Sequence, residues 1–303
     1  MKKRSDFEDK LAEILNSNNP LAVSQLDFLA DLTKEESISF KQAWMKTGEE
    51  RRRQVISHLT KLHSDNFYLD FTRVFLVCLE DSDRNIKIQA IMALGGEEDI
   101  SIITPLIRLL KTDESEEVRV AAATALGQFA LLAAVKKLSP DRSMEIYSNL
   151  LTVIEDETET SEVKRRCLEA IAPLDSLRVK ELVKQAYHSD SVNIKASALY
   201  AMGRNCDPVW LPIIIKEKDN SKSEIRYEVA EACGELGMEE AVSVLNELAG
   251  DEDIQVREAS VRALKQIYRP RAKQALQWLL DSSYQDVREA AQEALEEPEI
   301  FDL

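Results

Sequence analysis

Apolar and small residues recur along the chain at offsets that lie on one face of an α-helix. The segment from Val118 to Gly127 reads VRVAAATALG, in which an aliphatic residue is followed by a basic residue and then by small or aliphatic residues at +4, +7 and +8. These offsets share one side of a helix with about 3.6 residues per turn. The pattern therefore predicts an amphipathic helix that presents small residues to a neighbouring helix.

This pattern, which we number from its aliphatic anchor, occurs seven times. The anchors are Ile86, Val118, Val163, Ile194, Ile225, Val256 and Val287. Their successive separations are 32, 45, 31, 31, 31 and 31 residues, the +1 residue is always basic, and the +7 residue is always alanine. A second apolar stretch precedes these helices, as in Ala241 to Leu248. We therefore predict stacked helical hairpins, each with a helix A, an acidic turn and a helix B.

Acidic residues occupy the turns that precede the B helices. They include Asp81, Asp113, Asp190, Asp219, Asp251 and Asp281. An acid at this place suits the N-cap or the first turn of a helix. Such an acid can also form an ion pair with the basic +1 side chain of its own repeat or of the next one. We expect a ladder of such ion pairs, each worth about 0–1 kcal/mol where it is exposed.

The regular repeats occupy residues 81–296, and the flanking segments depart from the pattern. Residues 1–80 are expected to form divergent helical repeats that cap one continuous stack. The 45-residue interval predicts about one extra helical segment near residues 129–150, which is either a functional elaboration or a neutral insertion. Residues 297–303 form an acidic C-terminal tail, which is either a frayed end or a short docking motif.

From Ile86 onward the repeat resembles the HEAT-repeat family, in its short bacterial form with a V-R-x-x-A-x-x-A-L-G helix. The segments VRVAAATALG at Val118 and IRYEVAEACG at Ile225 carry this resemblance. It implies an all-α fold, an α-solenoid of stacked HEAT-like helical hairpins wound into a right-handed superhelix, with the B helices on the concave side. It says little about function, because one fold supports many functions.

The positions of helix B that avoid the core are candidates for binding. With 0, +4, +7 and +8 in the core, +2, +3 and +6 are expected to face outward. In the middle repeats these positions carry tyrosine and arginine, the residue types that most often dominate interface energy. We predict that these residues form a partner-binding patch; the simpler interpretation is that they are ordinary solvent-exposed residues. The members of the predicted patch are Arg165, Arg166, Tyr200, Arg204, Tyr227 and Glu231.

The charge of the chain limits the partners that it can bind. Lys plus Arg total 39 and Asp plus Glu total 55, which gives a net charge of −16. This excess disfavours nucleic acids and anionic membrane surfaces. The run Arg51-Arg52-Arg53 is expected to be a solvated helix start. Since we find neither an apolar run of about 18 residues nor a signal peptide, we expect a cytoplasmic protein, or a nuclear one in a eukaryotic cell.

Few residues could support catalysis. The four cysteines are far apart and form no CxxC motif, and Cys167 and Cys233 fall at core positions of the repeat. The three histidines, expected to be surface residues, are His58, His63 and His188. HEAT-type deoxyhypusine hydroxylases hold iron with His-Glu pairs, and no histidine here is followed by glutamate. We also find no phosphate-binding or nucleophile motif, so we expect no catalytic residue, cofactor or metal.

Three functions are compatible with these observations. The first is a protein–protein interaction scaffold or adaptor that presents a concave helical surface to a macromolecular partner. The second is a HEAT-repeat enzyme or enzyme subunit similar to the phycobilin lyases. The third is a nucleic-acid binder of the HEAT-like DNA glycosylase type, which the net charge opposes. The identity of the partner and the oligomeric state stay open.

Overall fold

The computed structural model describes residues 2–66 and 68–296, and all regular elements in that part of the chain are helices. The helices form two compact units. The first unit comprises the chain up to Leu132 together with Pro140–Val163, and the second comprises Ala133–Ser139 and the chain from Lys164 onward. The predicted acidic tail at 297–303 lies outside the described residues.

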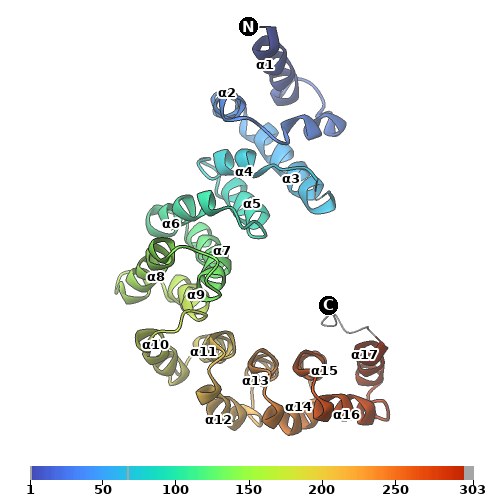
Figure 1. The fold of residues 1–303 in the computed structure, drawn as a ribbon. Coiled ribbons are helices and arrows are strands. Elements are labelled where there is room, and N and C mark those ends of the chain that lie inside the picture. Colours follow the sequence, from blue (N-terminus) through green and yellow to red (C-terminus); the bar gives the residue numbers. More distant parts are fainter. Residues whose placement is uncertain (1, 67, 297–303) are drawn as a thin grey trace. The chain divides into compact units, whose positions relative to one another are not determined.

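The first unit is built from helices that pack in pairs (Figure 1). Helix α3 packs against α5, α2 against α4, and α6 against α8. The bounds of its helices are α1 (Lys2–Leu15), η1 (Val23–Leu29), α2 (Lys34–Trp44), α3 (Glu49–Asp65), α4 (Thr72–Cys78), α5 (Arg84–Leu94), η2 (Ile100–Ile102), α6 (Ile103–Thr112), most of α7 (Glu116–Ala134), and α8 (Pro140–Glu155). Consecutive helices also pack together, α1 with α2 and α4 with α5, which is the hairpin arrangement that the sequence predicts.

The second unit has two layers of helices (Figure 1). The B helices α11, α13, α15 and α17 pack side by side in one layer, and α14 packs against α16 in the other. The bounds of its helices are most of α9 (Ser161–Ile171), α10 (Leu177–Tyr187), α11 (Val192–Asn205), η3 (Pro208–Trp210), α12 (Leu211–Ile214), η4 (Ile215–Glu217), α13 (Ser223–Leu236), η5 (Glu239–Ala241), α14 (Val242–Leu248), α15 (Ile254–Ile267), α16 (Pro270–Leu279) and α17 (Gln285–Glu296). The all-α, stacked-hairpin prediction is confirmed.

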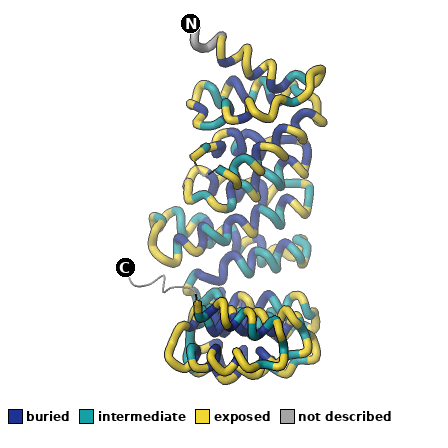
Figure 2. The backbone as a smooth tube through the Cα atoms, turned by 90° about the vertical axis from the view of Figure 1, so that its right-hand side faces the viewer, coloured by how far each residue is buried: buried dark blue, intermediate teal, exposed yellow. Residues whose placement is uncertain are grey.

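Most of the predicted core positions of the B helices are buried. Six of the seven +7 alanines are less than a tenth exposed, Ala93 is partly exposed, and Cys167 and Cys233 are fully buried at +4 and +8. Figure 2 shows that, within each unit, buried positions follow the sides of the helices that pack together, while exposed positions lie on the outside. Small residues at these positions let neighbouring helix axes approach closely.

The extra helical segment expected near residues 129–150 is not present as a separate helix. Instead, the extra residues lengthen two existing helices, α7 to 19 residues and α8 to 16 residues. Helix α7 continues past its repeat because Phe129, Ala130 and Leu132 extend its buried face. The chain then turns, and α8 begins at Pro140, a residue that suits the first turn of a helix.

The acidic turns have a different role from the one we predicted. Asp81 and Asp251 do not cap helices. Each accepts a hydrogen bond from the backbone N–H two residues later, at 2.8 Å and 2.9 Å. The N-caps are the next acids, Asp83 and Asp253. A carboxylate that bends the backbone in this way forms an Asx turn, so the prediction of N-caps at these two aspartates was wrong.

The ladder of basic +1 residues is confirmed. Arg226 donates to both carboxylate oxygens of Asp251, at 2.6 Å and 2.7 Å, and also to the carbonyl of Asn220. One repeat later, Arg257 donates to one carboxylate oxygen of Asp286, in the first turn of α17, and to the carbonyl of Asp251. Both arginines are less than a tenth exposed. These two arginines therefore tie their B helix to its own turn and to the next repeat.

Two of the three arginines at the start of α3, Arg51 and Arg52, are buried, so the expectation of a solvated helix start was wrong for these two and holds only for the exposed Arg53. Arg51 is 4% exposed and donates to the carbonyl of Asn16 at 2.8 Å. Arg52 lies 3.4 Å from the carboxylate of Asp81. These arginines satisfy groups of the protein itself, since a buried guanidinium needs acceptors. They do not form a surface for phosphate.

Helix α7 passes a length and composition test for a membrane span. Its residues Val118, Ala122, Leu126 and Phe129 are buried within the protein. A core helix of a soluble protein meets the same test. This single helix is therefore weak support for a membrane span.

Candidate partner-binding surface

The six residues of the predicted patch lie on three B helices. Arg165 and Arg166 are on α9, Tyr200 and Arg204 on α11, and Tyr227 and Glu231 on α13. We call the face formed by these residues, with Arg262 of α15, the B-helix surface. Tyr200 is 39% exposed, whereas Tyr227 is partly covered. The structure therefore brings the predicted residues onto adjacent helices of the second unit.

Glu169 organises the α9 end of the B-helix surface. Its carboxylate accepts from Arg165 and Arg166, each at 2.9 Å. Arg165 also donates to the hydroxyl of Ser197 on α11 at 2.9 Å, and Ser197 donates to Glu169. A carboxylate shared by two arginines fixes both guanidinium planes. The result is a rigid polar network that joins α9 to α11.

Two lateral ion pairs continue this arrangement across the layer. Arg204 of α11 lies 3.1 Å from Glu235 of α13. Arg262 of α15 lies 2.6 Å from Glu231 of α13. Partly exposed pairs of this kind add only about 0–1 kcal/mol to stability. Their main effect is to hold long side chains in one orientation.

The +3 positions do not all face outward, contrary to our expectation. Ser197 and Ala259 occupy this position and are buried between neighbouring B helices. The +6 positions Tyr200 and Arg262 are exposed. The difference arises because a helix inside a layer packs on both flanks as well as on its core face. The +3 position lies on a flank.

Glu228 is an acid on this flank whose environment opposes ionisation. Burial is the main cause, and together with the charges of Glu169 and Glu231 it raises the pKa of Glu228 to about 8, against the influence of Arg165. The Oε2 atom of Glu228 is buried and has no hydrogen-bond partner among the described residues. The carboxyl group is therefore mainly neutral at pH 7.

A cavity of about 410 Å³ lies beside Glu228, between α13 and α15. Tyr227 and Glu228 line one side, and Glu258 and Arg262 line the other. Burial raises the pKa of Tyr227, so its hydroxyl stays protonated at neutral pH and can donate a hydrogen bond. The B-helix surface is thus hollowed next to one of its tyrosines.

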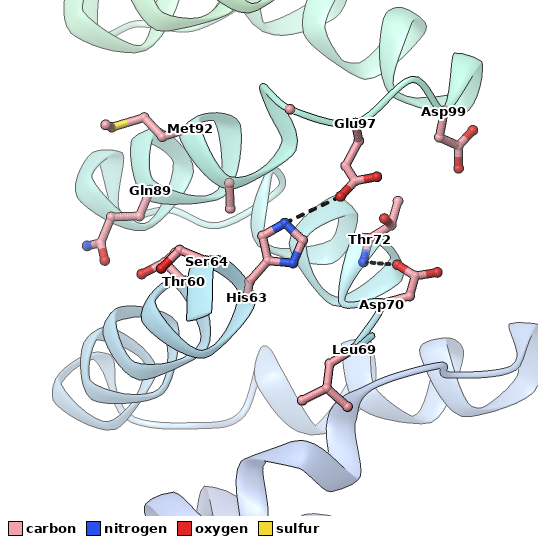
Figure 3. A pocket seen from close by; sticks show the side chains of 12 residues that line it. Thr60, His63, Ser64, Leu69, Asp70, Thr72, Gln89, Met92, Glu97 and Asp99 are labelled. Atoms are coloured by element: carbon pink, nitrogen blue, oxygen red, sulfur yellow. Dashed lines mark hydrogen bonds and ion pairs between the residues drawn. The ribbon is translucent and has the colours of Figure 1, made fainter. Parts of the chain in front are cut away.

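A second cavity, of about 660 Å³, lies in the first unit. Its walls come from α3, the α3–α4 loop, α5 and the loop after α5, and His63 lies in the middle of the lining side chains (Figure 3). The side chain of His63 is only 18% exposed, and its ring packs edge-on against Phe75 with the ring centres 5.4 Å apart. The expectation that His63 is a surface residue was therefore wrong.

The structure shows no metal-binding cluster in the residues it describes, where no group of three or more His, Cys, Asp or Glu side chains could hold a metal ion. His58 and His63 belong to one helix, α3. The chemistry that these two surfaces offer is hydrogen bonding, ion pairing and aromatic contact.

This architecture, layers of helical hairpins joined by a repeating Arg–Asp ladder, defines an α-solenoid repeat protein. The family described as HEAT repeats matches residues 72–140 and 208–296, which is more than half of the chain. The chain therefore belongs to the HEAT-repeat family.

Similarity to a curated protein is local. A deoxyhypusine hydroxylase from Drosophila pseudoobscura pseudoobscura is 29% identical over 89 residues, which is 29% of this chain and 30% of the relative. The chain thus aligns with less than a third of the length of that relative.

Two solved structures share the fold over most of the chain. Yeast importin-β (Kap95p) has a TM-score of 0.57 at 12% identity, covering 96% of this chain and 45% of that chain. The complex of CpcE and CpcF of phycocyanin lyase from Nostoc sp. PCC7120 has a TM-score of 0.51 at 17% identity, covering 82% of this chain and 93% of that chain. At these identities the likeness concerns the fold alone.

Proposed function

We propose that this protein is a cytoplasmic interaction scaffold or adaptor that binds a protein partner on the B-helix surface. The observation that carries the proposal is the placement of Tyr200 and Tyr227 on adjacent B helices, flanked by arginines whose orientation is fixed by ion pairs. Tyrosine and arginine most often dominate interface energies.

Preorganisation supports this proposal. Association loses free energy when flexible side chains become ordered at an interface. Arg165, Arg204 and Arg262 are already held by carboxylates of the protein. A partner that contacts these guanidinium groups would therefore lose less entropy than with free arginines. The cavity beside Tyr227 offers room for an inserted side chain.

Nucleic acid and small-molecule catalysis receive less support. The arginines of the B-helix surface are neutralised by Glu169, Glu231 and Glu235, and the chain as a whole carries −16. A phosphate backbone would lack free cations there. The fold match to phycocyanin lyase subunits identifies no residues that would hold a bilin.

A double variant of the full chain, in which both tyrosines are replaced by alanine (Tyr200→Ala and Tyr227→Ala), tests the proposal. We expect capture of partner proteins from a lysate of the source organism, read by quantitative mass spectrometry, to fall at least tenfold. Trp278→Ala is a matched control, because Trp278 is an aromatic residue of α16 in the other layer and is 62% exposed. Undiminished capture by the double variant, with an intact circular dichroism spectrum, would reject this surface.

A further inference from the structure

We propose that Arg288 forms a binding site for a carboxylate that is carried by an acidic peptide segment. Arg288 is the +1 residue of α17, the last helix that the structure describes (Figure 1). It occupies the same ladder position as Arg226 and Arg257, which each bind an acid of the next repeat. This inference rests on the ladder and does not depend on the B-helix surface.

The two inner arginines show how a ladder residue binds its acid. Each uses its Nη1 atom to donate to a backbone carbonyl of its own turn, Asn220 for Arg226 at 2.7 Å and Asp251 for Arg257 at 2.9 Å. The Nε and Nη2 atoms of Arg226 then donate to the two carboxylate oxygens of Asp251. The Nε atom of Arg257 donates to Asp286 at 2.8 Å. A guanidinium held in this way presents a planar fork that matches a carboxylate.

Arg288 has the first half of this arrangement and lacks the second. Its Nη1 atom donates to the carbonyl of Ser282, in the turn before α17, at 2.6 Å. No carboxylate pairs with Arg288 among residues 2–66 and 68–296. Arg288 is also partly exposed, whereas Arg226 and Arg257 are each 7% exposed. Its own turn therefore orients the guanidinium before a ligand arrives, which lowers the entropy that binding loses.

A cavity of about 660 Å³ lies beside Arg288 and gives a ligand access to it. One face of α17 lines this cavity, together with Leu280 at the end of α16. Leu280 is 39% exposed, and Leu295 adds a second apolar side chain. The lining acids Glu289 and Glu296 each accept a hydrogen bond from a glutamine one turn earlier, at 2.7 Å. The cavity thus combines a cation with apolar contacts.

The +5 position of α17 indicates which kind of occupant this face suits. In the inner B helices of the second unit this position is apolar and buried, at Leu199, Ala230 and Val261. In α17 it is Gln292, which is exposed. A further apolar repeat would have to bury the Gln292 amide, which is unfavourable without a hydrogen-bond partner. A polar segment with a carboxylate suits the face better.

Two sources offer such a segment. Residues 297–303 of this chain, EPEIFDL, follow directly after Glu296 and combine three acids with three large apolar residues. Arg288 and Glu296 are separated by about 12 Å along the helix axis, and seven extended residues span up to about 23 Å. The acids of this segment are therefore within reach of Arg288. An acidic segment of a partner protein offers the same chemistry.

Fluorescence anisotropy with a labelled, C-terminally amidated EPEIFDL peptide tests the proposal. The full chain carries Glu297→Gln, Glu299→Gln and Asp302→Asn, which neutralise the internal acids. We expect saturable binding, and at least tenfold weaker binding of the neutral peptide QPQIFNL. Adding Arg288→Gln should weaken binding of EPEIFDL at least tenfold, because it removes charge-assisted hydrogen bonds. The matched control is Arg271→Gln, since Arg271 is exposed on α16 and does not line the cavity.

A second variant protects the test against misfolding. Gln292→Glu adds a negative charge to the exposed lining and leaves Arg288 with its contact to Ser282, so it should also weaken binding of EPEIFDL. The proposal would be overturned by a lack of saturable binding or by equal affinities for EPEIFDL and QPQIFNL. Unchanged binding in both Arg288→Gln and Gln292→Glu would overturn it as well.

The unaltered chain distinguishes the two sources of the carboxylate. If residues 297–303 occupy the site, the unaltered chain should bind EPEIFDL at least tenfold more weakly than the chain with neutralised acids. Equal binding by the two chains identifies a partner protein as the source. Either result supports a carboxylate site at Arg288, and neither bears on capture of proteins by the B-helix surface.

Discussion

Buried charged residues in this protein act in two opposite ways. Some, such as Arg226 with Asp251, form pairs that satisfy each other and link repeats. Glu228 is different, because its carboxyl group is buried beside other acids and one of its oxygens has no hydrogen-bond partner among the residues that the structure describes. The ladder residues could be predicted from sequence, since they recur at one offset. Glu228 could not, because its neighbours come from separate helices.

The raised pKa of Glu228 predicts a pH-dependent stability. Its pKa is about 8 in the folded protein, against an ordinary value of 4.5, so between these values the folded state holds a proton that the unfolded state releases. The contribution of Glu228 to stability is therefore present below about pH 4.5 and lost as the pH rises toward 8. In Glu228→Gln, the free energy of unfolding should fall less between pH 5 and 8 than in the parent, by about 1 kcal/mol or more.

Urea denaturation at several pH values measures this difference. The control is Glu224→Gln, which changes an exposed acid on the same helix, α13. Its pH dependence should follow that of the parent. Parallel pH profiles for Glu228→Gln and the parent would show that Glu228 ionises normally.

At the scale of elements, close packing between B helices defines the second unit. A Cβ atom added at Gly203 of α11 would lie 2.7 Å from the Cα of Ala232 on α13. The same contact recurs one repeat later, where a Cβ at Gly234 would lie 2.9 Å from the Cβ of Ala263. Because the obstacle at Gly203 is backbone, the helices would have to move apart.

We therefore predict that Gly203→Ala destabilises the protein by about 1–2 kcal/mol. Overpacking in a close interface costs about 1–3 kcal/mol, and the better helix propensity of alanine offsets up to about 1 kcal/mol of this. The urea midpoint followed by circular dichroism reports the change. Gly96→Ala is the control, because a Cβ there meets nothing within 4 Å. A midpoint unchanged by Gly203→Ala would contradict the close approach.

Helix order and register at this scale follow from the sequence where the period is regular. The 31-residue spacing predicted α11, α13, α15 and α17 and their alanine-lined faces. The spacing did not predict the length of α7, because a helix extends beyond its repeat only where the residues that follow can be buried. It also failed at the +3 positions, since a period of 3.6 residues identifies one apolar face and says nothing of the flanks that neighbouring helices cover.

On the scale of the whole molecule, two units of one repeat family offer two different surfaces. In the second unit, sequence offsets placed the tyrosines and arginines of the B-helix surface on adjacent helices. The cavity of the first unit was beyond prediction, because it depends on how the α3–α4 loop folds beside His63. A repeat pattern describes helices, whereas a cavity made partly of loops depends on their particular path.

Site-specific photo-crosslinking tests the central claim most directly. A benzophenone amino acid is placed at Tyr200 on the B-helix surface and, separately, at Trp278 in the other layer. Both variants are irradiated in cells of the source organism. The account predicts that a discrete protein adduct forms at Tyr200, and that it does not form at Trp278. Adducts at Trp278 alone, or the same weak background at both positions, would contradict a partner-binding B-helix surface.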